Sequence, residues 1–143
     1  MLKGIPTIFS PELLKTLYEM GHGDEIVIAD GNFPAASLSK RLIRYDGHDV
    51  PELLEAIIKF FPLDTYVEQP VTLMEVVKGD PPEPTIWKEY QSIIRTEGCD
   101  ENNIAFLDRH SFYERAKNAY AIVATSEKAL YANILLTKGV VKD

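Results

Sequence analysis

The sequence predicts an α/β fold: a single three-layer domain over residues 1–143, with a mixed, mostly parallel sheet flanked by helices. The chain has 143 residues, of which 45% are hydrophobic, which is enough for one compact core. Several short segments, such as "EIVIAD" and "YAIVAT", are apolar in succession rather than alternating, as buried strands are. Amphipathic segments with helix signals alternate with them. The pattern does not determine the order of the strands.

Four segments are predicted to be helices from their capping residues and apolar periodicity. "FSPELLKTLYEMGHG" begins with Ser10 as N-cap and Pro11 in the first turn, and Gly21 is placed to end it. "VPELLEAIIKFFPL" is ended by Pro62, and "IWKEYQSIIRTEG" is ended by Gly98. The segment "RHSFYERAKNA" is the fourth predicted helix.

Five strands and one surface turn complete the predicted elements. The strands are predicted at residues 25–30, 71–77, 103–108, 120–126 and 133–139, and the turn at the acidic, proline-rich residues 78–85. No repeat or long linker divides them.

Charge and cysteine content exclude several function classes. The chain has 15 basic and 22 acidic residues, a net charge of −7, so it repels nucleic acid and anionic membrane surfaces. Cys99 is the sole cysteine, which excludes an intrachain disulfide and fits a reducing compartment. The first residues show no secretory signal, and no apolar segment approaches the ~20 residues of a membrane span. We expect a cytoplasmic protein.

His22 is the first candidate for chemistry, because it lies between two glycines in "GHGDEIVIADGNFP". A lone histidine is more often structural, but this one stands between a helix end and a buried strand, with little local packing. Imidazole is the side chain suited to donate and accept protons near neutral pH. His22 is therefore a candidate acid or base.

Asp30 closes the strand that follows. An Asx turn into Gly31 is the simpler interpretation, although ligands also bind at the carboxyl ends of strands in α/β sheets. An extended chain between His22 and Asp30 would cover about 26 Å at 3.3 Å per residue. Either Gly23–Asp24 folds the chain back, or the site forms where two subunits meet.

Three further residues could bind a polar ligand. Arg109 begins a predicted helix directly after a strand; it is either a solvated ion-pair partner or a donor to hydroxyls and anions. Tyr131 and Asn133 are two positions apart and share a face if the segment is extended. They are either a half-buried tyrosine and a turn asparagine, or groups that recognise sugar hydroxyls.

Other catalytic motifs are absent from the sequence. There is no GxGxxG, GxxxxGK[ST], HExxH or GxSxG, and His22, His48 and His110 are scattered, which disfavours a metal site. Without a phosphate loop, a redox cysteine pair or a metal, the remaining chemistry is proton transfer, and we expect no cofactor.

The stretches "SPELLKTLYEMGHGDEIVIADGNFP", "FYERAKNAYAIVAT" and "YANILLTKG" resemble the family of L-fucose mutarotases and ribose pyranases over essentially the whole chain. The "FP" after Asp30, "FYERA" and "ALYANILLTKG" favour the fucose mutarotases. The resemblance implies a ring-shaped homo-oligomer, a decamer, with sites near subunit contacts. It implies His22 as proton donor, and as substrate-binding residues Asp30, Arg109, Tyr131, Ala132 and Asn133. Asn32 stands where many relatives have histidine, and Ala132 where many have glycine.

The resemblance implies an isomerase that interconverts the anomers of L-fucose. The alternatives are a ribose pyranase acting on D-ribose through the same ring-opened intermediate, and a non-catalytic sugar-binding regulatory subunit. Anomer exchange needs one acid, one base and no cofactor or metal. At this level Tyr131, Asp30 and a bound water all remain candidates for the base.

Overall fold

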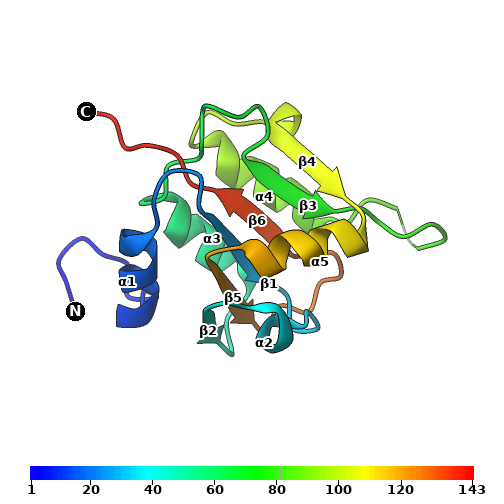
Figure 1. The fold of residues 1–143 in the computed structure, drawn as a ribbon, viewed down its shortest axis with the longest axis horizontal. Coiled ribbons are helices and arrows are strands. Elements are labelled where there is room, and N and C mark those ends of the chain that lie inside the picture. Colours follow the sequence, from blue (N-terminus) through cyan, green and yellow to red (C-terminus); the bar gives the residue numbers. More distant parts are fainter. Residues whose placement is uncertain (81) are drawn as a thin grey trace.

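A six-stranded mixed sheet with helices on both faces forms the protein in a computed structural model that describes residues 1–80 and 82–143 (Figure 1). The strands are β1 (Glu25–Ala29), β2 (Leu42–Tyr45), β3 (Val71–Met74), β4 (Ile104–Leu107), β5 (Ala121–Thr125) and β6 (Ile134–Thr137). The helices are α1 (Pro11–Glu19), α2 (Ala35–Leu38), α3 (Val50–Ile58), α4 (Ile86–Arg95) and α5 (Arg109–Asn118), with a 3-10 turn η1 (Glu101–Asn103). Pro81, within the predicted turn, lies outside the described residues.

The sheet is mostly parallel, as predicted, with the order β2-β5-β1-β6-β3-β4. The pairs β1–β5, β2–β5 and β3–β4 are parallel, whereas β6 is antiparallel to both β1 and β3. Because β6 is reversed, its first residue lies at the edge where the parallel strands end. That edge therefore gathers the residues that follow β1, β3 and β4 and the one that precedes β6.

Two hydrophobic cores lie on opposite faces of the sheet. The larger core contains Ile26 and Ile28 of β1 and side chains from α1, α3 and α4. The smaller core contains Val27 and Ala29 with side chains from α2 and α5. Successive residues of a strand point to opposite faces, so β1 is apolar from Ile26 to Ala29 because both faces are covered.

The predicted elements are found, and most of them are a few residues shorter than predicted. Ser10 caps α1 by accepting the backbone N–H of Leu13 at 3.1 Å. The helix ends at Glu19, before Gly21. β3 ends at Met74 rather than at Val77, because the N–H of Val77 donates to a side chain instead of to the sheet.

Three short elements were missed by the sequence analysis. They are α2 and the edge strand β2, of four residues each, and the 3-10 turn η1. β2 has exposed Arg44 between buried neighbours, and so short an alternation gives little signal.

Candidate active site

A pocket of approximately 190 Å³ lies at the edge of the sheet where the parallel strands end. Its walls combine polar and apolar side chains from several elements. They are Asp30, Asn32, Phe33, Met74, Asp80, Tyr113, Leu130, Tyr131 and Asn133. Three of the predicted site residues, Asp30, Tyr131 and Asn133, therefore line one cavity.

Asp30 is buried at the end of β1, with 8% of its surface exposed. Its backbone N–H donates to Asn133 Oδ1 at 2.7 Å, and its Oδ1 accepts the N–H of Asn32 at 2.9 Å. The residue thus forms the Asx turn and also lines the pocket. Burial raises the pKa of Asp30 above its ordinary value, although the amide N–H groups of Asn32 and Phe33 oppose the rise. A carboxylate in this state accepts a proton more readily than an exposed one.

The segment 131–133 is not extended, so the premise of the same-face argument for Tyr131 and Asn133 is wrong. Tyr131 has a φ of 57°, in the left-handed region. Two side chains of α4 hold this turn. The indole N–H of Trp87 donates to the backbone carbonyl of Tyr131 at 2.9 Å. The hydroxyl of Tyr90 donates to the backbone carbonyl of Ala132 at 2.6 Å. The turn, rather than a strand, directs Tyr131 and Asn133 into the same pocket.

Ala132 is buried behind the pocket. It is not among the described residues that line the pocket. Its side chain is fully buried in the larger core, and its backbone N–H is one of the groups that stabilise the Asp30 carboxylate. Tyr131 adopts the left-handed backbone conformation, and Ala132 does not. Alanine therefore fits here without backbone strain.

The hydroxyl of Tyr131 is held on the far side of the pocket. It donates to Asp80 and accepts the N–H of Val77 at 3.1 Å. The hydrogen bond to Asp80 raises the pKa of Tyr131, while the Val77 amide and the charge of Arg109 act in the opposite direction. Arg109 itself is exposed at the start of α5, after the N-cap Asp108. It lies near the pocket, outside the described lining.

His22 lies at the opposite end of β1 from Asp30. β1 runs unbroken between them and pairs along its length with β5 and β6. The N–H of Gly23 donates to the carbonyl of Lys138 at 2.8 Å, which fixes this segment beside the other end of β6. The chain does not fold back at Gly23–Asp24, so one chain does not bring His22 to the pocket.

The imidazole of His22 rests on a buried carboxylate that the sequence analysis missed. His22 Nε2 lies 3.1 Å from Asp64 Oδ1, and the ring of Tyr66 packs against the imidazole with centroids 5.2 Å apart. Asp64 follows α3 in the unremarkable segment "FPLD", and no motif links it to His22. Phe33 and Tyr113 were also not singled out, although each belongs to a stretch that carries the family resemblance.

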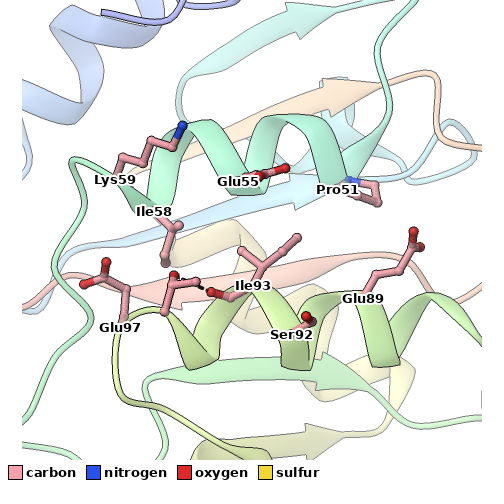
Figure 2. A pocket seen from close by; sticks show the side chains of 9 residues that line it. Pro51, Glu55, Ile58, Lys59, Glu89, Ser92, Ile93 and Glu97 are labelled. Carbon is pink, nitrogen blue, oxygen red and sulfur yellow. Dashed lines mark hydrogen bonds between the residues drawn. The ribbon is translucent and has the colours of Figure 1, made fainter. Parts of the chain in front are cut away.

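Larger hollows elsewhere on the molecule contain none of the predicted site residues. Figure 2 shows a groove of approximately 550 Å³ between α3 and α4, with Glu55 and Lys59 on one side and Glu89 on the other. An apolar groove of approximately 740 Å³ lies along α1, with Tyr18 and Phe60 in its wall. Within residues 1–80 and 82–143, no group of three or more His, Cys, Asp or Glu side chains is arranged to hold a metal ion. The helices of the same residues include none that is long and apolar enough to cross a membrane.

A covered mixed sheet with a small, partly polar pocket at its carboxyl edge defines a compact α/β protein suited to a small polar ligand. The profile of the RbsD / FucU transport protein family matches residues 3–141. The chain belongs to this family.

Close relatives have related names. Fucose mutarotase from Homo sapiens is 53% identical over 97% of this chain and 94% of its own length. L-fucose mutarotase from Haemophilus influenzae is 51% identical over 98% of this chain and 97% of its own length. The crystal structure of the fucose mutarotase from Streptococcus pneumoniae in complex with L-fucose matches with a TM-score of 0.95 and 56% identity. That match covers 99% of this chain and all of the other.

Proposed function

We infer that this chain is an L-fucose mutarotase, an isomerase that interconverts the α and β anomers of L-fucose. The observation that carries this inference is the match to the Streptococcus pneumoniae fucose mutarotase with L-fucose, at 56% identity and a TM-score of 0.95. Relatives about 50% identical over nearly the whole chain have the same name.

The two-sided pocket suits a 6-deoxy sugar. Ring hydroxyls would face Asp30, Asn32 and Asn133, which donate and accept hydrogen bonds. The methyl group would face the apolar wall of Phe33, Met74 and Leu130. A sugar with a misplaced hydroxyl would leave buried polar partners unpaired, at about 1–3 kcal/mol per group.

The reaction requires an acid and a base on opposite parts of the sugar. The anomeric O–H loses its proton, the bond from C1 to the ring oxygen breaks, and the ring oxygen gains a proton. After C1 rotates, the reverse steps close the other anomer, with no net change in protons. We assign the acid to His22, as the family resemblance implies.

We assign the base to Asp30. Its buried carboxyl has a raised pKa, which strengthens it as a proton acceptor. Tyr131 is the weaker candidate, because its hydroxyl already donates to Asp80 and its pKa is raised, which disfavours the phenolate. Arg109, near the pocket, would orient the sugar through its donors.

We propose that His22 reaches the sugar across a subunit contact, in a ring-shaped decamer. Two observations support this. His22 and the pocket lie at opposite ends of β1, and large apolar side chains are exposed near His22. Tyr66 is 69% exposed and Tyr18, in the apolar groove along α1, is 93% exposed. The groove that contains Tyr18 is contiguous exposed apolar surface, which marks a protein contact. A cytoplasmic location fits the single free Cys99.

Saturation-transfer NMR on an L-fucose solution tests the proposed activity. Saturating one anomer signal should reduce the other when catalytic amounts of the protein are present, and exchange should be slower for D-glucose at equal concentration. New furanose signals from D-ribose would instead indicate a pyranase. Line broadening without exchange would indicate a sugar-binding subunit. Equal rates for D-glucose and L-fucose would contradict the role of the polar wall.

A further inference from the structure

The strongest unassigned feature is the buried carboxylate beneath His22. We propose that Asp64 is a positioning residue, which holds the His22 ring with its proton on Nε2 and so leaves Nδ1 to exchange a proton with the sugar. The proposal rests on the proposed function, in which His22 is the acid.

The contact between the two side chains is asymmetric. The side chain of His22 is 46% exposed, whereas that of Asp64 is 4% exposed, and Nε2 lies 3.1 Å from Oδ1. An ionised carboxylate can only accept hydrogen bonds, so the ring nitrogen that faces it must carry a hydrogen. Among the described residues, Nδ1 of His22 takes part in no hydrogen bond. It is therefore the nitrogen available to a ligand.

The backbone around Asp64 fixes this carboxylate in place. The N–H of Asp64 donates to the carbonyl of Thr137 at 3.0 Å, next to the bridge between Leu63 and Lys138. Asp64 Oδ1 also accepts the N–H of Tyr66 at 3.0 Å.

Gly139 permits this close packing. A Cβ at that position would lie 2.7 Å from the carbonyl oxygen of Leu63 and 2.8 Å from the Cα of Asp64. No side chain fits there without moving the backbone that carries Asp64. The carboxylate thus has little freedom to turn away from His22.

The surroundings keep Asp64 charged. Burial opposes its ionisation, but the amide of Tyr66 and the ring of His22 together hold the pKa of Asp64 below its ordinary value. The Tyr66 ring covers one side of the imidazole, and the ammonium of Lys142 lies 5.4 Å from the centre of that ring. In hydrolytic triads a buried aspartate in the same place fixes the orientation and tautomer of the histidine ring.

The proton transfers balance with Nδ1 as the reacting atom. The Nδ1–H bond breaks as the bond from hydrogen to the ring oxygen forms, and the bond from C1 to the ring oxygen breaks. The anomeric hydroxyl gives its proton to the base in the pocket. Ring closure reverses both transfers. Throughout, Nε2 keeps its hydrogen and Asp64 keeps its charge.

A double-mutant cycle tests whether Asp64 acts through His22. The variants are Asp64→Asn, His22→Ala and their combination, with anomer exchange measured above the uncatalysed rate. We expect Asp64→Asn to lower kcat roughly 10²-fold with little change in KM. We expect it to cost nothing further in the His22→Ala background.

The matched control is Glu52→Gln. Glu52 and His48 form a second histidine–carboxylate pair, 3.4 Å apart and exposed, which the proposed site does not use. This variant should keep the wild-type rate. Light scattering on every variant checks that the assembly is unchanged.

A second readout does not depend on activity. Long-range ¹H–¹⁵N correlation spectra of the wild-type protein should show neutral His22 with its hydrogen on Nε2, and Asp64→Asn should populate the other tautomer. A wild-type ring with its hydrogen on Nδ1 would overturn the proposal.

The kinetic outcomes separate the two inferences. If His22→Ala abolishes exchange and Asp64→Asn leaves it unchanged, Asp64 is not a positioning residue and the proposed function stands. Asp64→Asn could instead lower the exchange rate by the same factor in the wild-type and His22→Ala proteins, or abolish the assembly. Either result would assign Asp64 a purely structural role. Full exchange in folded His22→Ala would remove the acid assignment and, with it, this inference.

Discussion

The two ends of β1 are built in contrasting ways. At the Asp30 end, a concave pocket holds a buried carboxyl with a raised pKa among several hydrogen-bonding groups. At the His22 end, an exposed imidazole rests on a buried carboxylate with a lowered pKa, near exposed apolar side chains. The Asp30 end has the pocket but no histidine, and the His22 end has the histidine but no pocket. Under the proposed function, the contrast teaches that "GHGDEIVIAD" encodes two half-sites and the strand that keeps them apart.

Mixing two inactive variants tests this separation and has the largest expected effect. His22→Ala and Asp30→Asn should each lower anomer exchange about 10²–10⁴-fold, because each removes a proton-transfer group. In mixed oligomers formed by refolding or co-expression, some contacts pair an intact His22 with an intact pocket. Random mixing in a symmetric ring should restore about one quarter of the sites.

The control for this experiment is a mixture in which both variants carry the same defect. His22→Ala mixed with His22→Gln should recover nothing. If the first mixture also stays inactive although hybrid rings form, the two groups act within one chain and the shared site is wrong.

The two carboxylates should give opposite pH dependences of stability. The pKa of Asp64 is lowered from 3.8, so its stabilising effect is present above that value and is lost as the pH falls through its folded-state pKa. The pKa of Asp30 is raised from 3.8, so the folded chain binds the proton more tightly. Its contribution is fully present below that value and is lost as the pH rises through the raised pKa.

Urea unfolding at fixed protein concentration between about pH 3 and pH 7 measures both effects. The destabilisation caused by Asp64→Asn should grow as the pH rises, and that caused by Asp30→Asn should shrink. Asp143→Asn is the control, because Asp143 is exposed and lies in neither half of the proposed site. Parallel slopes for Asp30→Asn and Asp64→Asn would remove the electrostatic contrast between the two ends.

Ala132→Gly should have the smallest effect. Ala132 does not adopt a positive φ, so glycine would add freedom to the unfolded chain and remove a buried methyl group, at a cost of about 1–2 kcal/mol in the free energy of unfolding. Chemical denaturation measures this difference, and exchange of L-fucose should hardly change. A more stable Ala132→Gly protein would show that the backbone at this position is strained.

The sequence was sufficient for the fold class because both sides of the sheet are covered, which makes successive residues of strands such as β1 apolar. It predicted Asp30, Tyr131 and Asn133, and the structure places all three around one pocket. It could not supply Asp64, Trp87 or Tyr90. These residues act through contacts between positions more than 40 residues apart, and local patterns carry no record of such contacts.

The hydrogen bond from Trp87 to the turn at Tyr131 has a practical consequence. Trp87 is the only tryptophan in the chain, so all indole fluorescence comes from a side chain attached to the wall of the pocket. A sugar that shifts this turn would alter the emission without any label. Titration of the unmodified protein with sugars would then report occupancy of the pocket optically, and rapid mixing would time the arrival and departure of the ligand.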